Sequence, residues 1–299
     1  MMNDFHDPVL IRESVEGLNL KSNGVYVDVT FGGGGHSKEI IKQLDNGKLI
    51  ALDQDLAAIN NAIVDSKFIM IQDNFRNIKQ VLELNNIFSV DGIIADLGVS
   101  SYQFSDNGRG FSIKYDSVID MRMNPSSSID GVFILNNYSQ LDLNRIFREY
   151  SDFNKPNLIS LPIIQARSRG LIKTVKDLIG IFHGISSKNS NRFFARIFQA
   201  IRIEVNDELN SLKELLNQSI SILKPHARLV VISYHSVEDR IVKQFMKFGN
   251  TLGSPKKDFY GNISSPFKII TKRPITPSDL ELRINNKSRS AKLRICERK

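Results

Sequence analysis

The chain has 299 residues, of which 41% are hydrophobic and 24% charged, and its formal net charge is +8. A single cysteine, Cys296, excludes disulfide bonds within the chain and argues against a zinc site built from thiolates. No apolar run is long enough to span a membrane, and the first residues lack the basic and apolar regions of a signal peptide, so we expect a cytoplasmic protein.

The first hundred residues alternate between strand and helix patterns. Residues 25–30, 48–52 and 68–71 are predicted strands, and the nearly continuous apolar run at 90–99 is typical of a buried central strand. Helices are expected after the first two strands, and Asp55 is well placed to cap the second of these helices. The alternation predicts an α/β fold, a doubly wound parallel sheet with helices on both faces.

The pattern is lost after Tyr102 and returns at about Asp207. A stretch of this length is too long for a structureless loop, and helix-like segments at 141–150 and 175–182 predict a helical insertion. We therefore assign residues 1–103 and 207–299 to the sheet domain and residues 104–206 to the insertion. In the final part we expect a helix at 208–223 ended by Pro225, a strand at 228–233, a helix at 237–248 and a last strand at 293–296.

The positive charge is concentrated in two segments. Residues 268–299 hold ten Lys and Arg against three acidic residues, and residues 165–203 hold eight against Asp177 alone. Such surfaces suit a polyanion, because each neutralised phosphate releases counterions. A solvated basic surface that keeps the protein in solution explains the same charge equally well, so charge alone does not decide between the two.

A glycine run follows the first predicted strand and leads into a helix. At Gly32 to Gly35, backbone N–H groups and the positive helix end can hold a polar or anionic part of a ligand, and a side chain would keep that ligand away. Asp53 ends the next strand about twenty residues later, where a carboxylate can accept hydrogen bonds from both hydroxyls of a ribose. The loop and the acid together predict a nucleoside ligand.

Three ligand classes share this arrangement. A phosphate-binding P-loop ends in Gly-Lys-Ser/Thr, but Gly35 is followed by His36 and Ser37, which disfavours NTPase chemistry. A dinucleotide fold spaces its glycines as G-x-G-x-x-G, whereas Lys38 stands where the last glycine belongs. S-adenosylmethionine has no pyrophosphate and tolerates a looser loop. A purely conformational role for the glycines, and a surface or helix-capping role for Asp53, stay open.

Two further strand ends point to the same crevice. Phe75 follows the third strand and is placed to stack on an adenine ring, although an aromatic residue there is more often part of the core. Asp96 lies at the tip of a strand too apolar to bury a carboxylate without a partner, which favours a functional role over a structural one.

Eight motifs occur in series along nearly the whole chain: HDPVL (6–10), DVTFGGGGHS (28–37), DGIIADLGVSS (91–101), RGFSI (109–113), DMRM (120–123), FQAIRIEVNDEL (198–209), VISYHSVEDRIVK (231–243) and RSAKLRICER (289–298). In sequence and order they resemble the bacterial 16S rRNA (cytosine-N4)-methyltransferases, which act near the decoding centre. The chain is therefore identified as a member of that family.

The resemblance implies a Rossmann-like class I methyltransferase domain, a helical insertion that helps to recognise RNA, and S-adenosyl-L-methionine as the cofactor. It also implies 16S rRNA within the small ribosomal subunit as the partner and no membrane contact, and it leaves a homodimer open. By motif position, the family's cofactor contacts fall on Gly34, Gly35, His36, Asp53, Phe75, Asp96 and Gln103.

The chain departs from the family pattern mainly around the insertion. Tyr102 stands in place of a proline, Asn124 in place of an acid, and Ala195 and Ile197 in place of two threonines. The stretch 151–164 does not resemble the family's Gly-Glu segment. These changes bear on substrate contacts of the insertion more than on the cofactor site.

The implied reaction is an in-line displacement in which the exocyclic amine of cytosine attacks a methyl carbon. Because the amine's lone pair is delocalised into the ring, the enzyme should supply an acceptor for the developing N–H charge and hold a base splayed out of its stack. The sequence leaves the catalytic acceptor unassigned, with Asp96 or a nearby backbone carbonyl as candidates.

Four arginines and one histidine are further candidates for substrate binding. Arg109, Arg122, Arg192 and Arg196 are candidate phosphate contacts, with surface salt bridges as the alternative. His235 follows a strong strand and would either orient the base or be satisfied locally. The five histidines show no metal-ligand spacing, so no metal site is predicted.

Two other functions stay open at this point. One is a ribosome-assembly factor that binds RNA without catalysis. The other is an NAD-linked oxidoreductase with the same fold, which the glycine spacing disfavours.

Overall fold

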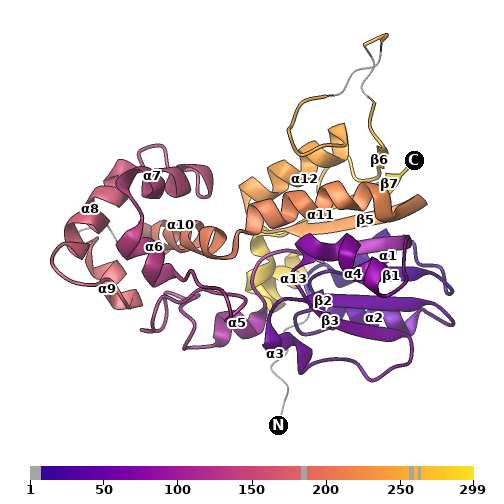
Figure 1. The fold of residues 1–299 in the computed structure, drawn as a ribbon, viewed down its shortest axis with the longest axis horizontal. Helices are drawn as coiled ribbons and strands as arrows, with labels where there is room; N and C mark the ends of the chain where they lie inside the picture. Colours follow the sequence, from indigo (N-terminus) through magenta and orange to yellow (C-terminus); the bar gives the residue numbers. More distant parts are fainter. Residues whose placement is uncertain (1–7, 183–186, 256–258, 262–263) are drawn as a thin grey trace. The chain divides into compact units, whose positions relative to one another are not determined.

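The computed structural model describes residues 8–182, 187–255, 259–261 and 264–299 (Figure 1). The chain divides into two compact units. The first combines Met1–Gly98 with Leu209–Lys299, and the second is the intervening Val99–Glu208. In the described residues, no helix has both the length and the apolar character needed to cross a bilayer.

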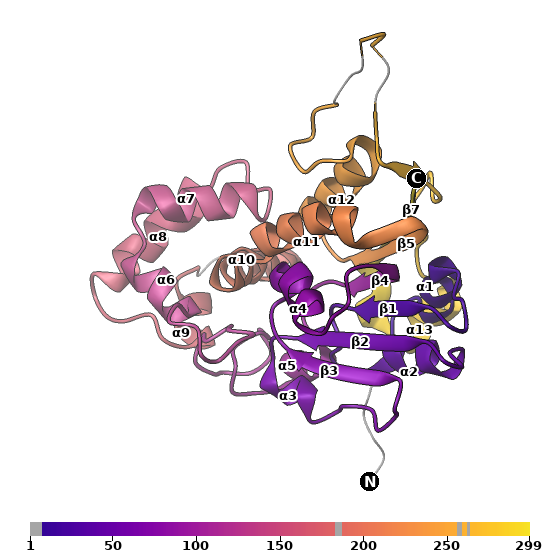
Figure 2. The same ribbon diagram turned by 45° about the vertical axis from the view of Figure 1, so that its right-hand side comes forward.

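Within the described residues, a seven-stranded sheet forms the centre of the first unit, with the order β3-β2-β1-β4-β5-β7-β6 (Figure 2; β6 is labelled in Figure 1). The first five strands in this order run parallel, while β7 pairs antiparallel with β5 and β6. The strand order reverses at β1, and in such sheets ligands bind beyond the carboxyl ends of the strands. The strands are β1 (Val25–Asp28), β2 (Lys48–Asp53), β3 (Phe68–Gln72), β4 (Val90–Asp96), β5 (Leu223–Ser233), β6 (Phe267–Ile269) and β7 (Lys292–Arg298).

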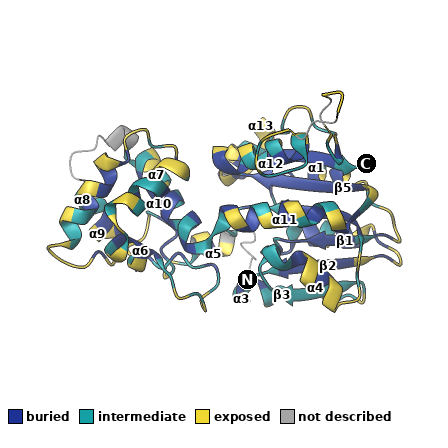
Figure 3. Ribbon diagram, turned by 45° about the horizontal axis from the view of Figure 1, so that its top comes forward, coloured by how far each residue is buried: buried dark blue, intermediate teal, exposed yellow. Residues whose placement is uncertain are grey.

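Helices cover both faces of this sheet, which confirms the predicted α/β doubly wound fold. Ile50 and Ile93 contribute to a buried core on the face of α4, α11 and α12, whereas Leu49 and Ile94 join the core under α1 and α2. Adjacent residues of one strand thus point to opposite faces, as the pleat requires. Figure 3 shows β1 and β2 in the colour of buried residues and β3 in that of intermediate ones. The helices that flank the strands are α1 (Ile11–Leu18), α2 (Gly35–Lys42), α3 (Leu56–Ile59), η1 (Phe75–Asn77), α4 (Ile78–Leu84), α11 (Glu208–Ile222), α12 (Ser236–Phe248), α13 (Asp279–Ile284) and η2 (Asn286–Ser290).

The structure differs from the prediction around Pro225. We expected a helix ended by this proline and a strand from Arg228, but α11 ends at Ile222 and β5 begins at Leu223. The pairing of β4 with β5 shifts register in this stretch, and His226 has a φ of 67°. Pro225 is tolerated because an irregular part of a ladder does not require its missing N–H.

The C-terminal strand β7 lies between β5 and β6. It confirms the predicted strand at 293–296, whereas β6 was not predicted from its three residues. Cys296 on β7 is fully buried, opposite Leu229 on one side and Ile269 on the other. Burial raises the pKa of its thiol well above the usual value.

The second unit is helical and encloses its own core. Leu143 and Phe147 of α7, Ile163 of α8, and Ile197 and Ile201 of α10 are fully buried together in it. Its helices are α5 (Ser101–Ser105), α6 (Gly131–Asn137), α7 (Gln140–Glu149), α8 (Asn157–Arg167), α9 (Val175–Gly180) and α10 (Ser187–Asn206).

The sequence predicted some of these helices and missed others. α7 and α9 confirm the helical segments at 141–150 and 175–182. α8 was not predicted, because Pro156 precedes it and Pro162 lies inside it. An interior proline disfavours a helix by about 3 kcal/mol, so the buried face around Ile159 and Ile163 must outweigh it.

Candidate active site

The segment between β1 and α2 has a backbone that suits glycine. Gly32 and Gly34 have φ values of 53° and 74°, in the left-handed region. A Cβ on Gly34 would lie 2.7 Å from Cζ of Phe31, and a Cβ on Gly35 would lie 2.7 Å from Cγ of Pro8. The glycines therefore do have a conformational role, which is compatible with a ligand on the exposed side of the same loop.

Asp53, the last residue of β2, is hydrogen-bonded to that loop. Its Oδ2 accepts from the backbone N–H of Gly32 at 2.8 Å, and its Oδ1 accepts from that of Asp55 at 2.9 Å. Burial raises the pKa of Asp53 to about 6. Asp53 is thus not a freely solvated surface carboxylate, and Asp55, not Asp53, caps α3 by accepting from the N–H of Ala57.

Asp28, the last residue of β1, holds the start of α2 to the sheet. Its Oδ2 accepts from Oγ of Ser37 at 2.7 Å, and its Oδ1 accepts from the N–H of Thr30 at 3.1 Å. Burial raises the pKa of Asp28 to about 6, and the charge of Asp53 acts in the same direction. Asp28 was not among the predicted site residues, although it ends a strand just as Asp53 and Asp96 do.

Asp96, the last residue of β4, has the partner that its apolar strand requires. Its Oδ1 accepts a hydrogen bond from the hydroxyl of Tyr234 at 2.8 Å, and its N–H donates to Oγ1 of Thr30 at 2.6 Å. Burial raises the pKa of Asp96 to about 7. Tyr234 directly follows β5, the parallel neighbour of β4, so it reaches the same edge of the sheet.

His36 lies in the first turn of α2 and is buried. Its Nε2 is 3.1 Å from the carbonyl oxygen of Val9, and its Nδ1 is 3.9 Å from Oδ2 of Asp96. Burial lowers the pKa of His36 to about 4, so the ring is neutral at physiological pH. A carbonyl oxygen only accepts, so Nε2 carries the proton and Nδ1 presents a lone pair towards Asp96.

Three carboxyl groups therefore gather at one edge of the sheet. Asp53, Asp28 and Asp96 end the adjacent parallel strands β2, β1 and β4, and each has a raised pKa because of burial. The charges of Asp53 on Asp28 and of Asp28 on Asp96 add to the shifts. A cation bound at this edge would relieve the repulsion, whereas a pyrophosphate would increase it.

The other predicted cofactor contacts lie in different surroundings. Phe75 begins η1 after β3 and is partly buried against the main core, so the structure gives it a packing role. Gln103 belongs to the second unit, where it forms a capping box with Ser100 at the start of α5. The N–H of Ser100 donates to Oε1 of Gln103 at 3.0 Å.

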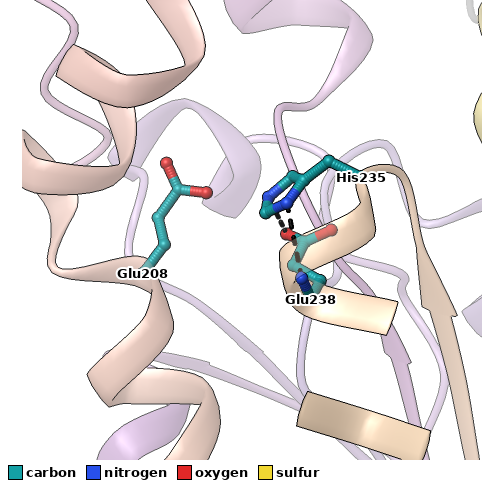
Figure 4. A group of neighbouring side chains, drawn as sticks. All are labelled: Glu208, His235 and Glu238. Carbon is teal, nitrogen blue, oxygen red and sulfur yellow. Dashed lines mark hydrogen bonds and ion pairs between the residues drawn. The ribbon is translucent and has the colours of Figure 1, made fainter. Parts of the chain in front are cut away.

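His235 is held within its own helix. It caps α12 by accepting from the N–H of Glu238, and its Nε2 lies 3.1 Å from Oε1 of that residue (Figure 4). Glu238 is buried, and its Oε2 accepts from the N–H of Tyr234 at 3.0 Å. These contacts agree with the local role that the sequence left open for His235. The contact from Glu238 also fixes the backbone of Tyr234, whose hydroxyl contacts Asp96.

Three of the four candidate arginines have internal partners in the second unit. Arg109 donates to the carbonyl oxygens of Arg122 and Met123. Arg122 pairs with Asp120 at 2.7 Å, and Arg196 donates twice to the carbonyl oxygen of Ser151 and lies 3.8 Å from the ring centre of Phe153. Arg192, on α10, has an exposed side chain. Of the four, Arg192 is the one best placed to meet a phosphate.

Two of the four substituted positions that depart from the family pattern have a local explanation. Ile197 lies in the core of the second unit, where an apolar residue fits. Asn124 accepts a hydrogen bond from the N–H of Ser126 and so shapes a turn. Tyr102 and Ala195 are exposed, and nothing in the structure explains them. Of the motif HDPVL, residues 6 and 7 lie outside the described residues.

Comparison with known proteins gives closely similar relatives. Three are named ribosomal RNA small subunit methyltransferase H. The protein of Flavobacterium johnsoniae is 50% identical over 99% of this chain and 98% of its own length. The protein of Karelsulcia muelleri is 47% identical over 100% of this chain and 100% of its own length. That of Parabacteroides distasonis is 44% identical over 98% of this chain and 97% of its own.

Solved structures give weaker matches. An rRNA methylase from Streptococcus thermophilus superimposes with a TM-score of 0.44 at 11% identity, covering 100% of this chain and 98% of its own. This likeness is too low to add to the assignment. The model of the MraW methylase family matches residues 3–299, which is nearly the whole sequence. The protein therefore belongs to the MraW methylase family.

Proposed function

We propose that the protein transfers a methyl group from S-adenosyl-L-methionine to the exocyclic N4 amine of a cytosine in small-subunit ribosomal RNA. Family membership and relatives named as small-subunit rRNA methyltransferases support the reaction class. The structural observation that carries the proposal is the group of three carboxyls beside the glycine loop, formed by Asp28, Asp53 and Asp96.

The charge of this edge favours S-adenosylmethionine over a dinucleotide. The cofactor carries a sulfonium and an ammonium, which three carboxylates attract, and its single carboxylate suits the N-terminus of α2. NAD would place a pyrophosphate beside the same acids. The structure thus adds an electrostatic argument against the NAD-linked oxidoreductase to the one from glycine spacing.

Asp53 is placed to bind the ribose of the cofactor. Its carboxylate accepts backbone hydrogen bonds from Gly32 and Asp55, and the backbone N–H of Gln54 acts on it as well. The two oxygens of an ionised carboxylate together offer about four lone-pair sites, so the group retains capacity for a ribose hydroxyl. The same contacts couple the ribose position to the glycine loop.

Asp96 is placed to receive a proton from the target amine. When bound, the cofactor supplies an activated methyl group; the amine's lone pair forms the new N–C bond, the electrons of the broken S–C bond stay on sulfur, and the amine loses a proton. A carboxyl with a pKa of about 7 can accept that proton near neutral pH. Asp96 is our candidate for the acceptor that the sequence left unassigned.

Recognition of the RNA is assigned to the second unit, the helical insertion. Exposed Arg192 on α10 and the excess of basic residues in 165–203 are suited to phosphate contacts. The cytosine N4 position within 16S rRNA, the context of the small ribosomal subunit and the cytoplasmic location belong to the same proposal and rest on the family resemblance.

Mass spectrometry of rRNA nucleosides is the direct test. N4-methylcytidine should be present in small-subunit rRNA of cells with the gene, absent after its deletion and restored by the wild-type gene but not by Asp53→Ala. Unchanged nucleosides after deletion would contradict the proposal.

Two further assays separate the alternatives. S-adenosylhomocysteine should raise the melting temperature of the purified protein, while NAD should not. Labelled methyl groups should reach immature or mature small subunits in vitro. Tight RNA binding without methyl transfer to either would favour a non-catalytic assembly factor.

A further inference from the structure

Tyr234 joins two strand ends of the candidate active site. Its hydroxyl lies 2.8 Å from Oδ1 of Asp96, and Ile232 and Asp96 are register partners on the neighbouring strands β5 and β4. The backbone of Tyr234 is itself fixed, because its N–H donates to Oε2 of buried Glu238. The backbone that carries the phenol is therefore held from the first turn of α12, and the hydroxyl is held by Asp96.

The direction of this hydrogen bond follows from the acidities of the two groups. Burial and the neighbouring charge of Asp96 raise the pKa of Tyr234 well above 10, so the phenol keeps its proton and donates. For Asp96, burial and the charges of Asp28 and Glu238 raise the pKa, and the hydrogen bond from Tyr234 opposes them. The phenol thus favours the anionic form of the carboxyl.

The second oxygen of Asp96 faces an acceptor. Oδ2 lies 3.9 Å from Nδ1 of neutral His36, whose proton is on Nε2 because that atom bonds to the carbonyl of Val9. Oδ2 of Asp96 and Nδ1 of His36 both accept hydrogen bonds, so together they suit a group that donates N–H bonds. The Asp96 side chain is 22% exposed, so it is not sealed within the core.

We propose that Tyr234 is a positioning residue for Asp96: its hydroxyl holds Oδ1 and keeps the carboxyl anionic, so that Oδ2 can accept the proton that the target amine loses on methylation. This inference rests on the proposed function. Tyr234 was neither one of the predicted strand-end residues nor one of the family's cofactor contacts.

Tyr234→Phe removes the hydroxyl and keeps the ring. The rate of a single methyl-transfer turnover on small subunits should be followed from pH 5.5 to pH 9. We expect the pH profile of the variant to shift to higher pH by about one unit, so that on its acid limb the variant is about tenfold slower than the wild type. At the alkaline plateau the two rates should be nearly equal. Tyr26→Phe is the matched control: it removes another buried hydroxyl, one that accepts from the N–H of Lys21 near the start of β1.

A second measurement does not depend on activity. Carboxyl ¹³C NMR of the protein without cofactor should show the Asp96 titration moving to higher pH in Tyr234→Phe but not in Tyr26→Phe, with the signal assigned by Asp96→Asn. Thermal unfolding of each variant establishes that it is folded.

The outcomes separate the two proposals. An unchanged titration of Asp96, or a changed titration with an unchanged pH profile in an active enzyme, would overturn the role of Tyr234. Absence of methyl transfer by the wild type would instead count against the proposed function, and the NMR titration would still decide whether Tyr234 controls the carboxyl.

Discussion

The carboxylate of Asp53 accepts a hydrogen bond from the backbone N–H of Gly32 at 2.8 Å, so the tip of β2 and the loop after β1 are directly coupled. A ligand that binds one of them is held by the other as well. The coupling explains why two features about twenty residues apart in sequence predict one ligand.

Asp53→Ala should abolish cofactor binding. The substitution removes the ribose acceptor and releases Gly32, so S-adenosylhomocysteine should raise the melting temperature of the wild type but not of the variant, while affinity for RNA stays near normal. Asp45→Ala, an exposed acid before β2, is the control and should retain the shift. A variant that lost RNA binding and kept the cofactor would show that the pocket is misassigned.

Gly34→Ala should destabilise the loop as well as impair binding. Its φ of 74° disfavours a side chain, and a Cβ would meet the Phe31 ring at 2.7 Å. We expect a loss of about 1–3 kcal/mol in the free energy of unfolding, measured by urea denaturation. Gly170→Ala is the control, because nothing lies within 4 Å of its Cβ position and its stability should change by less than about 0.5 kcal/mol. Equal stability of the two variants would refute the steric argument.

Asp28→Asn should gain stability relative to the wild type as pH rises. The folded protein binds the Asp28 proton up to about pH 6, whereas the ordinary carboxyl pKa is 3.8, so ionisation between these values lowers the free energy of unfolding. Asparagine avoids this loss, which amounts to about 1–3 kcal/mol between pH 4 and pH 7. Urea denaturation at both pH values measures the difference.

For Asp239, the pKa is shifted down and stability should depend on pH in the opposite direction. Burial raises its pKa, but the hydrogen bond and charge of Arg294 and the charge of Lys292 hold it below the usual value. Its contribution is therefore present above the unfolded pKa and is lost as pH falls through the folded value. Asp239→Asn should be more destabilised at pH 7 than at pH 3. Trends of the same sign in the two variants would contradict one of the two assignments, and the sign would show which.

Arg192 and Arg196, one helical turn apart on α10, should respond differently to removal. Arg192→Ala should weaken RNA binding several-fold and reduce the salt dependence by about one phosphate contact, with stability unchanged. Arg196→Ala should lower the free energy of unfolding by about 1–3 kcal/mol, because it loses two hydrogen bonds to Ser151 and the contact with Phe153. Filter binding at several salt concentrations and urea denaturation distinguish the two, and a reversal of these effects would rule out the assignment of Arg192.

The sequence predicted the parallel part of the sheet well, because most of its strands are buried and read as apolar runs. The strand expected at 90–99 ends at Asp96, and Leu97 to Val99 continue the apolar run without a ladder. α8 and the start of β5 were missed for the same reason: Pro162 and Pro225 locally indicate an end, and only tertiary packing and register reveal the continuation.

The candidate site was predicted from residues that end or follow strands, but not every such residue was among those predicted. Asp53 and Asp96 were selected, whereas Asp28 and Tyr234 were passed over although each stands at or directly after a strand end. The contact between Tyr234 and Asp96 exists because β5 lies beside β4 in the sheet. The sequence alone does not show that these two strands are neighbours. The partners of Arg122 and Arg196 likewise required coordinates.

Because Cys296 is fully buried, its reaction with thiol reagents can be used to follow local opening of the protein. With no other thiol in the sequence, thiol-specific reagents can label the protein only when the core around Cys296 opens. The labelling rate would then measure how often this core opens, and its slowing by a ligand would give the affinity without any modified residue.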